Sequence, residues 1–252
     1  MALLEVNKLH KRFGGLHAVN DVSFQVEPGQ IKAVIGPNGA GKTTLFNMIS
    51  GTFPASSGSV TFQGRDLKGK KPFQVATLGM ARTFQNIKMF SGMSALENVM
   101  VGRHVQSNAG FLASMFRAPW TLQEERDIRD KAMELLALLE IEEHAHSDAT
   151  SLAFGQQRAV ELARALALEP SLLLLDEPAA GLNIYETAEV GRLITKIRDL
   201  GITVLLVEHD MSLVMDISDE IVVLCFGEKI AEDTPRNIQM DPEVIKIYLG
   251  EE

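Results

Sequence analysis

The sequence predicts an α/β fold in which a mostly parallel β-sheet is covered by helices on both faces. Residues 172–175 and 202–207 are largely apolar, which is typical of strands that are buried on both sides. Helical patterns separate these runs, as they do in α/β proteins. The apolar run 31–35 leads straight into a glycine-rich segment, so a strand, a loop and a helix are expected there.

The N-terminal part is expected to hold short strands and one helix. Residues 4–9, 22–26 and 59–63 have the alternating or apolar patterns of strands. The residues that follow the glycine-rich segment predict a helix over 41–50, which Gly51 closes.

The segment from residue 89 to about 145 has the character of a helical insertion. Its clearest element is residues 124–142, where five apolar side chains recur at helical spacing. They are Ile128, Ala132, Leu135, Leu136 and Leu139. After it we expect a helix over 155–168, another that ends before Gly201, and a last helix that begins at Asp241 and Pro242.

Composition excludes several classes of protein. The chain has 252 residues, 46% of them hydrophobic, so it is neither disordered nor collagen-like. Its 24 basic and 33 acidic side chains give a net charge of −9. This balance argues against a nucleic acid or an anionic membrane surface as the main partner. A local basic site remains compatible with it.

The sequence also predicts a cytoplasmic chain. Cys225 is the only cysteine, which excludes an internal disulfide and indicates a reducing compartment. Residues 43–64 lack charged side chains, but Gly51, Pro54 and Gly58 interrupt them, so they are not expected to span a membrane. The N-terminus has no signal-peptide pattern.

A phosphate-binding loop is the most specific motif. It consists of Gly36, Pro37, Asn38, Gly39, Ala40, Gly41, Lys42 and Thr43, and fits Gly-x4-Gly-Lys-[Ser/Thr]. Its backbone N–H groups and the following helix N-terminus attract phosphate. Lys42 is expected to reach the β- and γ-phosphates of a nucleotide, and Thr43 to offer its hydroxyl to Mg²⁺. The alternative is an ordinary glycine-rich turn.

Two carboxylates follow the apolar strand 172–175. Asp176 and Glu177 are expected at the carboxyl edge of the sheet, where ligands bind in such folds. Asp176 suits a role in holding Mg²⁺ through water, and Glu177 is placed to polarise an attacking water molecule. A solvated acidic loop is the alternative reading.

His209 and Gln85 alone are weak evidence for a functional site, but their places in the order of motifs indicate a functional role. His209 follows the strand 202–207, and Gln85 lies between the phosphate loop and the segment Leu152, Ala153, Phe154, Gly155, Gln156, Gln157 and Arg158. With Asp176, Glu177 and residues 180–183, this order resembles the ATP-binding subunits of ABC transporters over essentially the whole chain. That family has a P-loop NTPase (RecA-like) core with an antiparallel β subdomain and a helical subdomain.

The resemblance implies roles for matching residues. It implies that Lys42, Gln85, Glu177 and His209 are catalytic and that Mg²⁺ is bound through Thr43, Gln85 and Asp176. It implies that ATP is bound by the loop 36–43, Thr44 and the signature residues Leu152, Ala153, Phe154, Gly155 and Gln156. Phe13 would stack on adenine, or would be a core residue. The implied domains are 1–88 with 164–252 for the core and 89–163 for the helical subdomain.

A finer resemblance is to the larger-type ATPases of branched-chain amino-acid importers. It rests on residues 11–15, the insertion 103–126, the signature segment, residues 177–183 and 208–211, and the ending 241–250. It implies uptake of branched-chain or related hydrophobic amino acids, driven by ATP hydrolysis. It also implies a peripheral place on the inner face of the cell membrane.

The implied partners are permease subunits, a second ATPase subunit that is a paralogue or a second copy, and indirectly an extracytoplasmic solute-binding protein. Met89, Phe90 and Met93 follow Gln85 and are candidate permease contacts or core residues. Two alternatives stay open. One is a soluble ABC ATPase that assembles or remodels a protein complex; the other is an importer of a different solute, such as urea or amides.

One departure from the family pattern concerns the signature. The common motif is Leu-Ser-Gly-Gly-Gln, whereas Ala153 and Phe154 replace the serine and the first glycine here. The lost hydroxyl bond to the γ-phosphate should cost about 0.5–1.5 kcal/mol. Gly155 and the helix N-terminus still permit phosphate to approach. The composite site built on this segment is therefore expected to be weakened.

Overall fold

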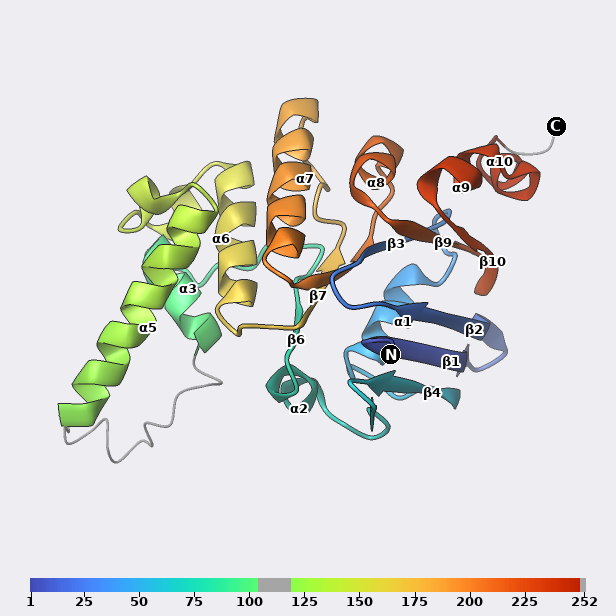
Figure 1. Cartoon of the computed structure of the whole chain (residues 1–252), viewed down its shortest axis with the longest axis horizontal. Coiled ribbons are helices and arrows are strands. Elements are labelled where there is room, and N and C mark those ends of the chain that lie inside the picture. The colour runs from blue at the N-terminus through green and yellow to red at the C-terminus, as the bar shows by residue number, and fades with distance from the viewer. Residues whose placement is uncertain (104–118, 250–252) are drawn as a thin grey trace. The chain divides into compact units, whose positions relative to one another are not determined.

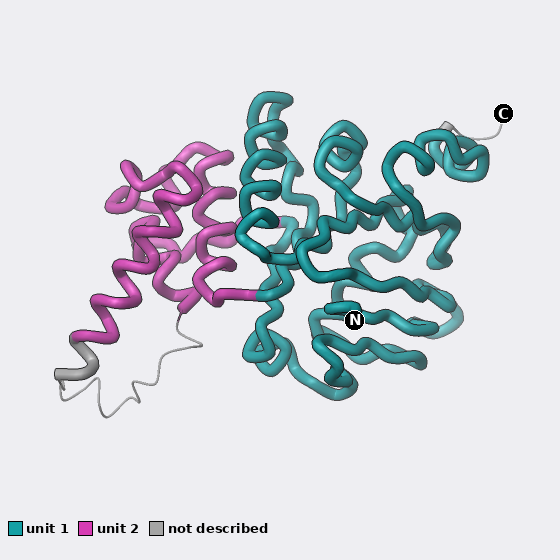
Figure 2. Tube along the Cα trace, viewed as in Figure 1, with its two compact units in different colours: residues 1–85, 171–252 teal, residues 86–170 magenta. Residues whose placement is uncertain are grey.

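The computed structural model describes residues 1–103 and 119–249, and these residues fall into two compact units (Figures 1 and 2). Unit 1 consists of residues 1–85 and 171–252, and unit 2 of residues 86–170. The domain limits 88/89 and 163/164 that the sequence suggests stay a prediction.

Unit 1 contains an antiparallel sheet with the strand order β2-β1-β4-β5. Its strands are β1 (Leu4–Phe13), β2 (Leu16–Val26), β4 (Ser57–Phe62) and β5 (Arg65–Asp66). The first two are longer than predicted because they form one hairpin, in which Phe13 pairs with Leu16. Gly14 has φ of +58° at this turn, a conformation that glycine adopts without steric cost.

The second sheet of unit 1 has six strands in the order β10-β9-β3-β8-β7-β6. They are β3 (Ile31–Ile35), β6 (Met80–Arg82), β7 (Leu172–Asp176), β8 (Thr203–Val207), β9 (Glu220–Cys225) and β10 (Glu228–Asp233). Only β10 pairs antiparallel. All residues of β3, β7 and β8 are buried, which confirms the predicted parallel sheet with strands covered on both faces.

Helices of unit 1 lie on both sides of this sheet, with α7 and α8 opposite α1 (Figure 1). The helices are α1 (Lys42–Ile49), α2 (Pro72–Thr77), α7 (Ile184–Asp199), α8 (Met211–Ile217), α9 (Pro235–Met240) and α10 (Pro242–Leu249). Asn183, Asp210 and Asp241 begin α7, α8 and α10, and each accepts hydrogen bonds from backbone N–H groups of the first turn. Such caps satisfy donors that the helix leaves unpaired.

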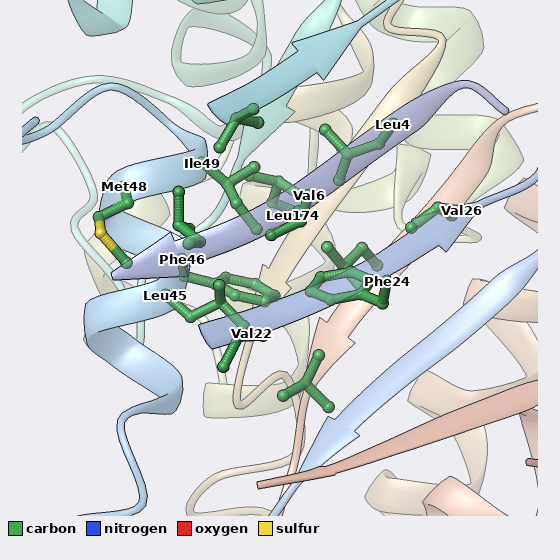
Figure 3. Close-up of a cluster of buried hydrophobic side chains, with 14 of the residues drawn as sticks. Leu4, Val6, Val22, Phe24, Val26, Leu45, Phe46, Met48, Ile49 and Leu174 are labelled. Atoms are coloured by element: carbon green, nitrogen blue, oxygen red, sulfur yellow. The ribbon is translucent and has the colours of Figure 1, made fainter. Parts of the chain in front are cut away.

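The main core of unit 1 packs α1 between the two sheets (Figure 3). Leu45, Phe46 and Ile49 of α1 are fully buried and pack against Leu4 of β1 and Leu174 of β7. The phosphate loop lies between β3 and α1, so this packing fixes the position of both ends of the loop.

The described part of unit 2 is helical and contains α3 (Ala95–Gly102), α5 (Pro119–Leu138), α6 (Phe154–Leu166) and the short 3₁₀ turns Glu142–His144 and Ala149–Ser151. The predicted helix over 124–142 ends at Leu138. Its apolar spacing is confirmed, since Leu136 and Leu139 are buried. Most of the predicted insertion 103–126, residues 104–118, lies outside the described residues.

Several short elements were not predicted: β5, β6, β9, β10, α2, α3, α8 and α9. None exceeds eight residues, and β6 has three, too few for a periodic pattern. No helix among the described residues is long and apolar enough to cross a membrane.

Candidate functional site

The phosphate loop follows β3 at the carboxyl edge of the six-stranded sheet, as predicted. Two of its glycines are required by close packing as well as by φ. A Cβ on Gly36 (φ +149°) would lie 2.1 Å from the carbonyl oxygen of Leu224, and one on Gly41 (φ +99°) would lie 2.3 Å from that of Ala18. These glycines let neighbouring strands press against the loop and define its path.

Lys42 begins α1 and is almost completely buried. Its Nζ donates hydrogen bonds to the carbonyl oxygens of Gly36 (2.6 Å) and Pro37 (3.1 Å). Burial lowers the pKa of Lys42 below its ordinary value, and the negative charges of Glu177 and Asp176 oppose that shift. The ammonium group therefore lies in the field of both carboxylates. Thr43, the next residue, is exposed.

Asp176 ends β7 and forms a buried ion pair with Arg82 of β6. Arg82 Nη2 lies 2.9 Å from Asp176 Oδ2. Arg82 Nη1 also donates to Asn47 Oδ1 (2.8 Å) and Ser50 Oγ (2.7 Å), near the end of α1. This arginine joins the carboxylate to the helix that follows the phosphate loop. No role for Arg82 was predicted from the sequence, although it stands only three residues before Gln85.

Glu177, Gln85 and His209 meet at one carboxylate oxygen. Gln85 Nε2 donates to Glu177 Oε2 over 2.8 Å, and His209 Nδ1 lies 3.8 Å from the same oxygen. The three residues follow β7, β6 and β8, which are neighbouring parallel strands. The side chain of His209 is 61% exposed and that of Glu177 20% exposed, so the cluster is open to solvent on one side.

Glu177 has a strained backbone, with φ of +49°. A non-glycine residue in this region costs of the order of 1–3 kcal/mol and often marks a functional site. Its N–H donates to the carbonyl oxygen of Val207 over 2.9 Å, which ties the turn to β8. The strain turns the chain sharply at the end of β7.

The donor set at this edge fits Mg²⁺ delivered with a nucleotide. Mg²⁺ usually takes one or two carboxylates, with phosphate and water oxygens completing its shell. The carboxylate of Asp176, the hydroxyl of the exposed Thr43 and the amide of Gln85 all carry oxygen atoms that can bind this ion. The described residues contain no cluster of three or more His, Cys, Asp or Glu that could hold a metal ion by itself.

Phe13 lies at the end of β1 and is 48% exposed, so the core alternative for this residue is wrong. Its ring meets that of Phe53 edge-on, with centroids 5.7 Å apart. Lys11 Nζ lies about 5 Å from both ring centroids, at 5.1 and 4.8 Å. A half-exposed aromatic ring of this kind offers a surface on which a base could stack; its contact with adenine stays a prediction.

The signature segment lies in unit 2, at the N-terminus of α6. Ala153 is the N-cap, and its N–H donates to the Gln156 side chain over 3.0 Å. Gln157 Nε2 donates to the Leu152 carbonyl oxygen over 2.9 Å. Phe154 is 45% exposed. Alanine supplies no side-chain acceptor, so the cap lacks the hydroxyl that the family motif places there.

The segment after Gln85 is only partly exposed. Phe90 is 47% exposed, whereas Met89 and Met93 have intermediate exposure. The Phe90 N–H donates to the side chain of the buried Asn98 over 2.9 Å, and the guanidinium of Arg164 lies 5.5 Å from its ring centroid. Phe90 is therefore held in place by unit 2 and still presents part of its ring to solvent.

Comparison with known proteins identifies the family. A family model described as "ABC transporter" matches residues 19–180, and one described as "Branched-chain amino acid ATP-binding cassette transporter" matches residues 228–252.

The chain is 46% identical to the high-affinity branched-chain amino acid transport ATP-binding protein BraF of Pseudomonas aeruginosa, over 99% of this chain and 98% of BraF. It is 43% identical to LivG of Escherichia coli K12, a protein with the same description, over the same shares.

A solved structure also matches: the ADP conformation of MJ1267, an ATP-binding cassette of an ABC transporter. It has 33% identity and a TM-score of 0.87, with all of both chains covered. The predicted ABC ATPase fold and the predicted resemblance are thereby confirmed. The chain belongs to the ABC transporter family, as one of its ATP-binding, ATP-hydrolysing proteins.

Proposed function

We propose that this ATPase powers an importer of branched-chain or related hydrophobic amino acids, through a separate permease. The observation that carries the ATP chemistry is the convergence of Lys42, Asp176, Glu177, Gln85 and His209 at one edge of the sheet. The solute is inferred from the similarity to BraF and LivG and from the match of residues 228–252.

In this proposal each residue of the cluster has a distinct task. The loop N–H groups and Lys42 bind the phosphates of ATP, and the positive charge of Lys42 stabilises the charge that develops on the γ-phosphoryl group. Glu177 orients and activates the attacking water. Gln85 and His209 sense the γ-phosphate, because both already lie beside the Glu177 carboxylate.

Mg²⁺ would be held by the Thr43 hydroxyl, the Gln85 amide oxygen and, through water, Asp176. When bound, it neutralises charge on the phosphate oxygens. Arg82 orients Asp176 for this task, because its guanidinium fixes one carboxylate oxygen and is itself anchored by Asn47 and Ser50.

The working unit is proposed to be a pair of ATPase subunits. Each phosphate loop would face the signature segment of the other subunit, so that two ATP molecules join the pair and hydrolysis releases it. The partner is a paralogue or a second copy of this chain. The lost hydroxyl at Ala153 weakens the composite site to which this chain contributes its signature.

The permease is proposed to contact the segment after Gln85, where the ring of Phe90 is partly exposed. Met89 and Met93 beside it are flexible apolar side chains, which suit a surface that receives another protein. This contact would hold the chain at the inner face of the cell membrane, near a transporter that an extracytoplasmic solute-binding protein loads.

Affinity purification from native membranes, followed by an ATPase assay of the recovered complex, tests the proposal. We expect a permease and a second ATPase to co-purify, and leucine with its binding protein to stimulate turnover. Stimulation by urea or an amide instead would contradict the proposed solute. Recovery of soluble proteins without any integral membrane protein would favour the assembly-type ATPase. Glu177→Gln in the same complex is the control for background hydrolysis.

A further inference from the structure

Glu208 is a completely buried carboxylate that the mechanism above does not use. It stands between β8 and His209, and its relative exposure is 0%. Its Oε1 accepts the N–H of Ala179 over 2.8 Å. Its Oε2 accepts the N–H groups of His209 (2.7 Å) and Asp210 (3.0 Å).

These three hydrogen bonds compensate for the burial of the Glu208 carboxylate. A buried carboxylate is costly unless hydrogen bonds or an opposite charge compensate it. No lysine or arginine forms an ion pair with Glu208 among the described residues; besides the N–H donors, the ring of His209 lies nearby, with Nδ1 3.4 Å from Oε2. Backbone donors from two separate segments thus hold this side chain.

The two segments are those that carry Glu177 and His209. Ala179 lies two residues after Glu177, at the start of the connection to α7, and it is buried. The bond from Glu177 N–H to Val207 holds the strained turn on one side, and the bond from Ala179 N–H to Glu208 holds it on the other. The same carboxylate fixes the backbone of His209 directly.

We propose that Glu208 is a positioning residue for hydrolysis. Its carboxylate couples the turn that bears Glu177 to the loop that bears His209, so that a shift of either backbone moves the other. Glu208 touches no nucleotide in this scheme and acts through the two backbones that it joins. The proposal rests on the roles proposed above for Glu177 and His209.

The bond pattern makes Glu208→Gln an informative variant. Glutamine has the same shape, but only one of its two terminal atoms accepts hydrogen bonds. The amide nitrogen must then face either Ala179 N–H or the pair His209 and Asp210, so one side of the coupling is lost. We expect kcat to fall roughly tenfold or more, with the affinity for ATP changed by less than about threefold.

A double-mutant cycle separates positioning from a general defect. If Glu208 acts partly through His209, Glu208→Gln should lower kcat in the His209→Ala background by clearly less than it does in the wild type. Losses that multiply fully in the double variant would overturn the coupling. A kcat for Glu208→Gln within about twofold of wild type would also overturn it.

Two further variants distinguish a loss of positioning from a general loss of stability. Glu232→Gln neutralises a partly buried carboxylate that pairs with Lys32 and Lys229, both at 2.6 Å, on β10. It should lower the melting temperature without lowering kcat. Glu208→Asp keeps the charge but is one methylene shorter, and should give an intermediate kcat. It replaces Glu208→Gln as the test if the amide variant does not fold, and a wild-type kcat there overturns the proposal.

The outcome is distinguishable from a failure of the proposed function. If Glu177→Gln keeps wild-type turnover, the assignment of Glu177 fails whatever Glu208 does. If Glu177→Gln is inactive while Glu208→Gln is normal, only the positioning role fails.

Discussion

Gln85 and Glu177 are joined by a hydrogen bond of 2.8 Å from the amide nitrogen to Oε2, although 92 residues separate them in sequence. The bond links the segment after β6 to the turn after β7, which are neighbouring strands. His209 Nδ1 lies 3.8 Å from the same oxygen. Any group that displaces Gln85 or His209 therefore changes the surroundings of the carboxylate that is proposed to activate water.

Glu177→Gln is expected to stop turnover while ATP still binds. The amide has nearly the shape of the carboxylate but cannot accept a proton, so kcat should fall by roughly 100-fold or more. Steady-state ATPase assays and equilibrium binding of ATP measure the two effects, and size-exclusion chromatography with ATP should show a trapped dimer. Glu189→Gln on the exposed side of α7 is the matched control. Wild-type turnover of Glu177→Gln would contradict the proposed role of Glu177 in activating water.

Lys42→Ala is expected to weaken ATP binding. The ammonium is proposed to bond to phosphate oxygens, and a hydrogen bond to a charged group contributes about 1.5–3 kcal/mol. The affinity should therefore fall roughly ten- to 100-fold. Isothermal titration calorimetry with ATP measures this, and Lys68→Ala, an exposed lysine in a loop, is the control. Equal affinity in Lys42→Ala would count against the phosphate-loop assignment.

Arg82→Met is expected to destabilise unit 1. It leaves Asp176 without its partner in a site where the side chains of both residues are less than 10% exposed, at 8% and 6%. Removing one member of a buried pair costs about 3–5 kcal/mol. Denaturant unfolding measures the loss. Arg65→Met, which changes an exposed arginine of β5, should stay within about 0.5 kcal/mol of wild type. Equal losses in the two variants would disprove the structural role of Arg82.

Ala153→Ser is expected to improve both α6 and the composite ATP site. Serine at the N-cap accepts an N–H bond from the first turn, and it stabilises a helix by about 1 kcal/mol relative to alanine. Its hydroxyl would also restore a bond to the γ-phosphate of the partner's ATP, which raises turnover up to about tenfold. Hydrogen exchange of α6 and ATPase assays report the two effects.

Ala153→Gly separates these effects. Glycine is nearly as good an N-cap as serine, but it has no hydroxyl for the phosphate. It should strengthen α6 and leave turnover unchanged. A rise in turnover equal to that of Ala153→Ser would show that the hydroxyl is not the cause.

We expect the ionisation of Tyr248 to lower the free energy of unfolding at alkaline pH. Burial raises the pKa of this phenol from 10.0 to about 12, although hydrogen bonding with the backbone of Gly36 acts in the opposite direction. Below pH 10 the phenol is neutral in the folded and the unfolded chain alike. Above it the unfolded chain loses its proton first, so this contribution to the free energy of unfolding falls as the pH rises toward about 12.

Unfolding free energies measured across this pH range test the assignment. Tyr248→Phe should show a shallower decline than wild type. Tyr185→Phe, which alters the only other tyrosine, 88% exposed, should keep the wild-type decline. In the Tyr185→Phe variant the tyrosinate absorbance should rise with a midpoint near pH 12. A midpoint near pH 10 would contradict the raised pKa of Tyr248.

The buried strands were predictable from sequence because burial on both faces leaves a continuous apolar run. The predicted strand 31–35 coincides with β3, and 172–175 falls one residue short of β7. The phosphate loop was predictable because glycines are required by backbone packing at fixed positions, as at Gly36 and Gly41.

Arg82 and Glu208 show what the sequence alone does not reveal. Arg82 forms a hydrogen bond to Asp176, which is 94 positions away in the sequence, and Glu208 accepts one from Ala179, which is 29 positions away. These contacts depend on which strands lie side by side, and no local sequence pattern predicts the order of the strands. A polar residue at the edge of an apolar strand is compatible with a solvated end, and only the fold shows it enclosed.

The place of β3 between β8 and β9 governs the order in which the protein can form on the ribosome. Residues 31–35 are synthesised early, but their two neighbours are residues 203–207 and 220–225. All of unit 2 leaves the ribosome before either neighbour, so its helices can pack while the strand ahead of the phosphate loop still has unpaired edges. Nascent chains arrested before residue 203 should therefore expose residues 31–35 to protease, and ATP can stabilise the chain only late in its synthesis.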